Sequence, residues 1–457
     1  MSQSSRNIVI PHLGRVEGHG GIFVKIVGNT VHEVNMDIFE GSRYYEALLK
    51  GKHFLEIQGI ITRVCAICSA NHTVAALTAI ENALGIKQTE RVHTLRGLLL
   101  LGATIESHAL HVFALALPDF LGFDSVIGMA SKYPGEVAFA LKLKQLGNRI
   151  QELIGGRAIH PINTLVGGFG KLPGHRELQA IRSELQAALD PLMGAVDLVA
   201  TLPVPGWAEQ DTVYVALRPY EEAYRFRGVS ICTSRGEEFP IESYRDVVRE
   251  FTVEHSHAKH SALASGETYM VGSLARLKLW GHYLGGRARE AMGKLFPGGV
   301  QDNILLNNWA QLVELVHCVE HSIEVCDELL AMPETAREMV DYEVRAGRGV
   351  GAIEVPRGTL PILRAIISVV VPAENWTISV MGREGYSSAA ADEKERIIPT
   401  RTTPSIFAFP NFILLLLLIA INCPQVIRPF LPLICHFGHG FIEDVEQSVH
   451  EVDEAQA

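Results

Sequence analysis

Long helical segments, several of them apolar on more than one face, constrain the fold of this chain more than any other feature of its sequence. The helical pattern covers residues 94–117, 137–154, 176–189 and 309–330. A helix that is apolar around most of its circumference is buried among other elements and does not lie on a surface. A chain of 457 residues is long enough to enclose such helices. The sequence therefore predicts a core of long, buried helices.

Shorter segments of β-branched residues lie on both sides of this predicted core. Residues 21–27 and 31–38 flank a Gly-Asn dipeptide, which favours the positive φ angles of a hairpin turn. Residues 205–275 combine strands with loops, and residues 342–360 have an extended pattern that three glycines interrupt. We predict an α+β fold, mainly helical, with a long buried helix-bundle core and β-rich peripheral lobes.

We treat the chain as one unit, because it contains no internal repeat and no obvious linker. Its parts are a β-rich N-terminal part with a paired-cysteine motif, a helical core, a mixed insertion and a diverged C-terminal part, at 1–72, 73–200, 201–360 and 361–457. Within the last part, residues 412–421 form a continuous apolar run. Pro410 and Pro424 leave this run shorter than the roughly 20 residues of a spanning helix, so we prefer a buried segment to a membrane segment at 406–422.

The charge balance excludes one class of function, and the N-terminus indicates a compartment. The net charge is −11 and the basic residues form no cluster, so the chain lacks the basic surface that nucleic-acid binding requires. The first residues are polar and contain no apolar stretch typical of a secretion signal. We therefore expect a cytoplasmic protein that binds no nucleic acid.

Two of the seven cysteines, Cys65 and Cys68, form a C-x-x-C pair just before a helical pattern at 73–84. Two cysteines at this spacing can place both sulfur atoms on one side of a tight turn and bind a soft metal ion. The pair by itself also fits half of a zinc site, a redox dithiol or a chance occurrence. No second C-x-x-C pair completes a structural zinc site, so the flanking residues must decide between these interpretations.

The flanking residues resemble a known metal site. Residues 63–72, RVCAICSANH, are similar to the first metal motif of nickel–iron hydrogenase large subunits, R-x-C-G-x-C-x-x-x-H, with Ala66 in place of the usual glycine. Further segments resemble the same family in the same order: RVEGH at 15–19, RYYE at 43–46, SHALH at 107–111 and EVPRGTL at 354–360. Two more segments resemble its soluble, multimeric, cofactor-reducing branch: HAKHS at 257–261 and VGSLAR at 271–276.

The resemblance implies a nickel–iron centre, whose iron carries cyanide and carbon monoxide, with Cys65 and Cys68 among the metal ligands. It also implies that Glu17 passes protons between the centre and solvent. Arg357 would hold its guanidinium group over the two metals. For Glu46 two interpretations remain open, because the family places a magnesium ligand there, whereas a carboxylate on a helix needs no such role.

The same resemblance implies a reaction and partners. The reaction is the reversible oxidation of dihydrogen to protons and electrons. The electrons leave through an iron–sulfur small subunit, because seven cysteines are too few to bind a cluster relay as well. We expect an apolar patch around residues 15–19 and 65–72 to bind that subunit. Further electron-transfer subunits, a maturation protease and metal chaperones are also typical partners. His108 and His111 are expected to form hydrogen bonds and not to bind metal.

The C-terminal half of the metal site departs from the family. The second cysteine pair of the family lies in a D-P-C-x-x-C-x-x-H motif, whereas the nearest segment here, FLPLICHFGH at 430–439, has the single cysteine Cys435. Cys423 lies twelve residues earlier. Three explanations stay open: a diverged site, a site that Cys423 and Cys435 complete in an unusual way, or a local scrambling of the sequence after the EVPRGTL segment.

We predict that Cys435 does not reach bonding distance of Cys65 and Cys68, and that this sequence has little or no hydrogenase activity. The alternative function is that of a non-catalytic homologue, a structural subunit that docks an electron-transfer partner. The catalytic subunit ranks first because relatives that use the fold without the metals lack the first cysteine pair. We expect this pair at the interior end of the first long helix, facing the segment of Arg357.

Overall fold

The computed structural model describes residues 4–14, 18–358, 362–368 and 377–382, with side chains described up to residue 358. Several positions discussed above lie outside the described residues: Glu17, the apolar run at 412–421, Cys423 and Cys435.

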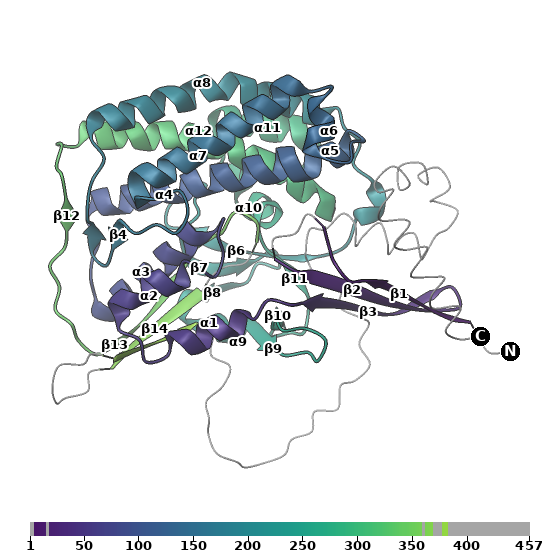
Figure 1. The fold of residues 1–457 in the computed structure, drawn as a ribbon, viewed down its shortest axis with the longest axis horizontal. Coiled ribbons are helices and arrows are strands. Elements are labelled where there is room, and N and C mark those ends of the chain that lie inside the picture. The colour runs from purple at the N-terminus through teal and green to yellow at the C-terminus, as the bar shows by residue number, and fades with distance from the viewer. Residues whose placement is uncertain (1–3, 15–17, 359–361, 369–376, 383–457) are drawn as a thin grey trace, which may run out of the picture.

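Long helices form one layer of the molecule and carry most of its buried apolar residues (Figure 1). They are α4 (Glu90–Ala109), α7 (Pro134–Gly155), α8 (His175–Ala200), α11 (Gly286–Leu295) and α12 (Asn307–Ala331). Helix α4 packs on α7 and α12, and α12 packs in turn on α8 and α11. The helix-bundle core predicted from the apolar segments is confirmed.

Local sequence sets the ends of these helices. The side chain of Thr89 caps the first turn of α4. Helix α7 begins with Pro134, whose fixed φ suits a first helical position, and its C-terminal cap is Gly156, whose φ of 80° suits glycine. Helix α8 is longer than predicted and continues through Pro191, because the residues beyond it, beginning with Leu192, are buried in the core.

The central helix continues beyond the end of α4. It passes through a π-helical segment (Leu110–Ala116) into α5 (Leu117–Phe120). The combined segment Glu90–Leu121 is long and apolar enough to span a membrane, but 78% of its most apolar stretch is buried inside the fold. Such burial is what the central helix of a packed bundle requires. Segments of π-helix are rare and often lie at functional sites.

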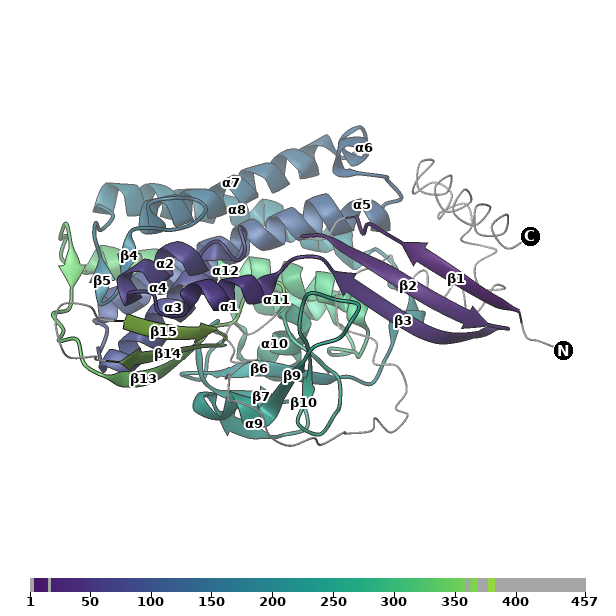
Figure 2. The ribbon, with the colours of Figure 1, turned by 60° about the horizontal axis from the view of Figure 1, so that its bottom comes forward.

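The β-rich lobes surround the helix layer. An antiparallel sheet of β1 (Ser5–Ile10), β2 (Gly20–Val27) and β3 (Thr30–Ile38) extends from one end of the molecule (Figure 2). The predicted hairpin between β2 and β3 is confirmed, and Gly28 in its turn has a φ of 61°. Another sheet has the order β11-β6-β7-β8 and contains β6 (Val213–Pro219), β7 (Gly228–Thr233), β8 (Glu238–Pro240) and β11 (Tyr269–Met270).

The remaining elements are short and connect these layers. Strands β9 (Val248–Phe251) and β10 (His260–Leu263) form an antiparallel pair, and the small sheet β12-β5-β4 joins Glu338–Met339, Gly168–Phe169 and Thr164–Leu165. The short helices are α1 (Ser42–Leu49), α2 (Phe54–Ile61), α6 (Val126–Ala130), α9 (Tyr244–Val247) and α10 (Ser273–Trp280). The predicted α+β class, mainly helical with β-rich lobes, is confirmed.

One helix lies against a glycine-rich strand and thereby positions the paired cysteines. Helix α3 (Ser69–Leu84) packs along β13 (Gly347–Ala352), which pairs with β14 (Ile362–Ser368) and through it with β15 (Thr377–Gly382). Three glycines of β13 that we expected to interrupt an extended segment instead belong to a continuous strand. A Cβ atom added to each would lie 1.9–2.2 Å from a backbone oxygen of α3: that of Ala83 for Gly347, of Ala79 for Gly349 and of Ala75 for Gly351. Alternating glycines therefore let the strand backbone touch the helix backbone.

Candidate metal centre

The paired cysteines lie in the turn that connects α2 to α3. Cys68 is the N-terminal cap of α3, and its backbone N–H donates a hydrogen bond to Sγ of Cys65 at 3.1 Å. A backbone donor and the positive end of a helix both favour a negatively charged sulfur. The local fold therefore places Cys65 where a thiolate is stabilised.

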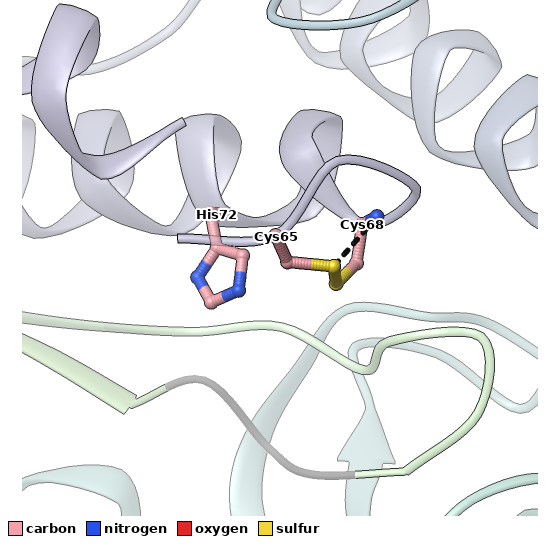
Figure 3. A group of neighbouring side chains, drawn as sticks. All are labelled: Cys65, Cys68 and His72. Carbon is pink, nitrogen blue, oxygen red and sulfur yellow. Dashed lines mark hydrogen bonds between the residues drawn. A yellow bond between two sulfur atoms is a disulfide. The ribbon is translucent and has the colours of Figure 1, made fainter. Parts of the chain in front are cut away.

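The two sulfur atoms and a histidine ring gather at one point (Figure 3). One ligand atom from each of Cys65, Cys68 and His72 lies within 4.8 Å of the other two, the group of potential metal ligands found among the described residues. The structure joins Cys65 and Cys68 as a disulfide, with their Cα atoms 5.5 Å apart. Because the thiolate is the form that binds metal, the metal-binding state is the reduced pair. Two thiolates and an imidazole suit nickel, iron or zinc.

His72 is the residue of this group to which the sequence analysis gave no role. Burial lowers the pKa of His72 to about 4, so its ring is neutral near pH 7. Its Nδ1 atom is buried and has no hydrogen-bond partner among the described residues. A buried polar atom normally has a partner, so this nitrogen fits a site that a bound group completes. In the sequence, His72 could have been recognised as a neighbour of Cys68 because it follows that cysteine by four residues, about one helical turn.

Neighbouring elements fix the turn that carries the cysteines. The ring of His160 donates to the carbonyl oxygen of Thr62 at 2.9 Å, and the backbone N–H of His160 donates to Oγ of Ser69 at 3.0 Å. His160 has a φ of 58°, which is uncommon for a residue other than glycine. On the other side, the hydroxyl of Tyr45 donates to the carbonyl oxygen of Arg63 at 2.9 Å.

The segment that follows β13 reaches the same place in the fold. The side-chain amide of Asn71 donates to the carbonyl oxygen of Glu354 at 3.0 Å. Figure 3 shows the chain after β13 passing opposite Cys65 and Cys68. The structure thus brings together two motifs that lie almost three hundred residues apart, and Arg357 follows three residues after Glu354.

A buried arginine holds the backbone just before Arg357. Arg276 donates to the carbonyl oxygens of Val355 at 2.9 Å and Pro356 at 3.1 Å. Its Nε atom and Nη2, the nitrogen that also donates to Pro356, form a bidentate pair with the carboxylate of Glu314, at 2.6 and 2.8 Å. This planar arrangement uses the full fork of donors that only arginine offers.

The surrounding charges are compensated within the buried core. Burial raises the pKa of Glu314, but Arg276 and His108 outweigh this effect and hold the pKa well below its usual range. Burial, with the charge of Arg357 as a further cause, lowers the pKa of both His108 and His111, and that of His111 falls to about 3. The cationic group of Arg357 therefore acts on the histidines at the π-helical segment of the central helix.

Both histidines form the hydrogen bonds expected of them. His108 pairs through Nε2 with Glu314 at 2.8 Å, and His111 pairs through Nδ1 with Oε1 of Gln311 at 2.6 Å. Neither belongs to the group of potential ligands around Cys65 among the described residues.

Glu46 lies elsewhere, on α1. Its Oε1 atom lies 2.7 Å from Nζ of Lys259, which precedes β10. The structure therefore brings Cys65 and Cys68 to the segment of Arg357, and it gives Glu46 a basic partner from the HAKHS segment.

Comparisons with known proteins extend these local similarities. Residues 43–141 match the family model described as nickel-dependent hydrogenase. Sulfhydrogenase 1 subunit alpha of Pyrococcus furiosus is 42% identical over 357 residues, which cover 77% of this chain and 82% of the relative. Sulfhydrogenase 2 subunit alpha of the same organism is 35% identical over 356 residues, with the same two coverages of 77% and 82%. The fold is similar to that of an NAD+-reducing NiFe-hydrogenase in the H2-reduced state, with a TM-score of 0.72, 26% identity, and coverage of 80% of this chain and 86% of that one.

Proposed function

Because this chain belongs to the nickel-dependent hydrogenase family, whose members are oxidoreductases that act on hydrogen, we propose that it is the catalytic large subunit of a nickel–iron hydrogenase. The proposed reaction is the reversible oxidation of dihydrogen to protons and electrons. The observation that supports it most directly is the gathering of two cysteine sulfurs and a buried histidine beside the segment of Arg357.

The residues in this place are suited to the proposed centre. Cys65 and Cys68, once reduced, supply soft thiolate ligands of the kind that nickel and iron bind. A nickel–iron centre bound here would supply the metal chemistry for splitting dihydrogen. Arg357 would supply a fixed positive charge beside this centre, where it suits the cyanide and carbon monoxide ligands that the family's iron carries. Glu17 carries the proton toward solvent. The neutral ring of His72 has a nitrogen available to hydrogen-bond a ligand sulfur.

The proposed ligand set needs two further thiolates. The other described cysteines, Cys232, Cys318 and Cys326, are buried and belong to no group of potential ligands with Cys65. The remaining candidates are Cys423 and Cys435, outside the described residues. The missing D-P-C-x-x-C-x-x-H motif favours a second candidate function, that of a structural subunit that docks an electron-transfer partner without binding the metals.

Both candidate functions require an electron-transfer partner, which we propose to be an iron–sulfur small subunit. Exposed apolar side chains lie near the cysteine turn, on α1, α2 and the loop after α7: Tyr44 (65% exposed), Leu55 (58%), Ile159 (38%) and Ile162 (54%). The amide of Gln58, one turn after Leu55 on α2, donates to the carbonyl oxygen of Pro161 at 3.2 Å, which holds this helix beside the loop. An apolar patch of this kind suits an obligate interface, which buries about 2,000 Å² or more in total.

The proposal extends to the cellular setting. The relatives named above are alpha subunits, so we propose that this chain also works in a larger complex, with further electron-transfer subunits. Assembly of the centre would require metal chaperones and a maturation protease. We propose the cytoplasm as the compartment, because free thiols persist in its reducing environment.

Metal analysis of the complex tests the proposal. The chain is purified anaerobically with its partner, and nickel and iron are measured per chain together with hydrogen-dependent dye reduction. Nickel and iron that are both lost in Cys68→Ser, but retained in Cys232→Ser, support the catalytic subunit. A complex that binds its partner equally well in both variants and contains no nickel identifies the docking subunit and overturns the catalytic proposal.

A further inference from the structure

A lysine occupies the position beside Glu46 where the family resemblance leads us to expect a magnesium ion. Nζ of Lys259 lies 2.7 Å from Oε1 of Glu46 and 3.5 Å from Oε2 of Glu250. The three side chains are largely buried, with 11% of Lys259, 24% of Glu46 and 17% of Glu250 exposed. Because two carboxylates face one cation with little water around them, this ion pair is stronger than one on an open surface.

The backbone around Lys259 is fixed, so its position does not depend on a flexible side chain alone. His257 lies two residues before Lys259, and its backbone N–H donates to the carbonyl oxygen of Ile38 at 2.9 Å. The Nδ1 atom of its ring forms a hydrogen bond with the carbonyl oxygen of Phe39, also at 2.9 Å. Two residues after Lys259, Ser261 lies opposite Glu250 in the β9–β10 pair. The HAKHS segment is thus attached to β3 on one side and to β9 on the other.

The three groups join parts of the chain that are distant in sequence. Glu46 lies on α1, Glu250 on β9 and Lys259 just before β10. Figure 1 shows α1 beside β9 and β10. The ammonium group therefore ties the helix that precedes the cysteine turn to the β9–β10 hairpin, as a bridging cation would.

We propose that the ammonium group of Lys259 takes the place of a magnesium ion in this chain and excludes that ion from Glu46. Magnesium requires several oxygen ligands in a nearly octahedral arrangement at about 2.0–2.1 Å. Here Oε1 of Glu46 already accepts a charged donor, and a divalent ion beside an ammonium group is repelled. An ammonium group has three donors and a compact charge, so it can bridge two carboxylates without the cost of dehydrating magnesium. The inference rests on the proposed function only for the expectation of magnesium, and nickel content tests that function separately.

The first test uses the unaltered protein. The full chain, with its partner where the two purify together, is freed of loosely bound ions and analysed for magnesium. Its melting temperature is then measured with EDTA and with added magnesium chloride. We expect no stoichiometric magnesium and no change in melting temperature in either condition. Tightly bound magnesium, whose removal by EDTA lowers the melting temperature, would overturn the proposal.

The second test removes the lysine cation. Lys259→Ala takes away the ammonium group that both Glu46 and Glu250 contact, so we expect a lower melting temperature that magnesium restores, and binding of magnesium that isothermal titration detects. The double variant Lys259→Ala/Glu46→Gln should lose this binding. The matched control is Lys294→Ala, because Lys294 also bridges two carboxylates, those of Asp197 at 2.7 Å and Glu290 at 3.1 Å, on a more exposed surface. Magnesium should not bind to this control, and a folded Lys259→Ala protein that binds no magnesium would also overturn the proposal.

Discussion

The side-chain amide of Asn71 donates a hydrogen bond to the carbonyl oxygen of Glu354 at 3.0 Å, and both residues are fully buried. Asn71 lies in the first turn of α3, three residues after Cys68, and Glu354 lies three residues before Arg357. This bond joins the cysteine turn to the segment that carries the arginine. The geometry of the candidate metal centre therefore depends on a residue that is not itself a ligand.

Asn71→Ala should destabilise the protein, because it leaves the Glu354 carbonyl without this donor in a buried place. We expect a loss of about 1–3 kcal/mol in the free energy of unfolding. Chemical denaturation followed by circular dichroism measures it. Asn35→Ala is the matched control, because Asn35 donates to Glu33 on the surface and its removal should cost less than about 0.5 kcal/mol. Equal losses in the two variants would contradict a structural role for the Asn71 bond.

Gly349→Ala should push β13 away from α3. The new Cβ atom would lie 2.2 Å from the backbone oxygen of Ala79, and backbone atoms cannot move aside as a flexible side chain can. We expect a loss of about 3 kcal/mol or more, at the upper end of the range for overpacked cores. Gly194→Ala should instead stabilise the protein, since no neighbouring atom lies within 4 Å of the Cβ position of Gly194 in α8. That control should gain up to about 1 kcal/mol from helix propensity.

Arg276→Lys should be poorly tolerated although the charge is kept. A lysine cannot reach Glu314 through two parallel bonds and also donate to the Val355 and Pro356 carbonyls. Breaking a buried ion pair costs about 3–5 kcal/mol, so we expect low soluble yield and a lower melting temperature. Arg182→Lys, at the exposed pair with Asp327, is the control and should leave both measurements nearly unchanged. A fully stable Arg276→Lys protein would show that the fork of donors is dispensable.

Acidification should weaken the fold through His317. Burial, together with the charges of His321 and Arg225, lowers the pKa of His317 to about 3. The unfolded chain takes up a proton near pH 6.5 while the folded chain does not, so stability is present above that pH and falls as the pH decreases toward 3. The slope for one such histidine is about 1.4 kcal/mol per pH unit. His317→Gln should reduce the slope of unfolding free energy between pH 6.5 and 5, whereas His12→Gln, at an exposed position, should leave it unchanged.

Cys435→Ser should leave hydrogen-dependent dye reduction unchanged, because we expect Cys435 not to reach the cysteine pair and the activity of this sequence to be close to background. Two thiolates alone leave a nickel ion with open positions and too little negative charge. The assay compares the unaltered complex with Cys435→Ser and Cys68→Ser under hydrogen. Substantial activity that both substitutions abolish would show that Cys435 completes the site and would reject this prediction.

The sequence by itself determined most of the long helices, the hairpin and the identity of the cysteine motif, because these features depend on residues close together along the chain. Apolar patterning predicts a buried helix from its own residues, as for α12, and Gly28 predicts a turn by tolerating a positive φ. Likewise, Cys65 and Cys68 share one turn, so their proximity follows from a spacing of three.

Only the tertiary structure decided what the distant residues do, because a contact across the core leaves no local pattern. From the sequence alone, the glycines of β13 suggest an interrupted strand. The structure shows that a side chain at these positions would collide with the backbone of α3, which explains why they are glycines. Lys259 and Glu46 are 213 positions apart, and nothing near either residue indicates that a lysine lies at the carboxylate. Likewise, the charges of Arg276 and Glu314 lead one to expect both side chains on the protein surface. Both are buried in the structure, because α10 packs on α12.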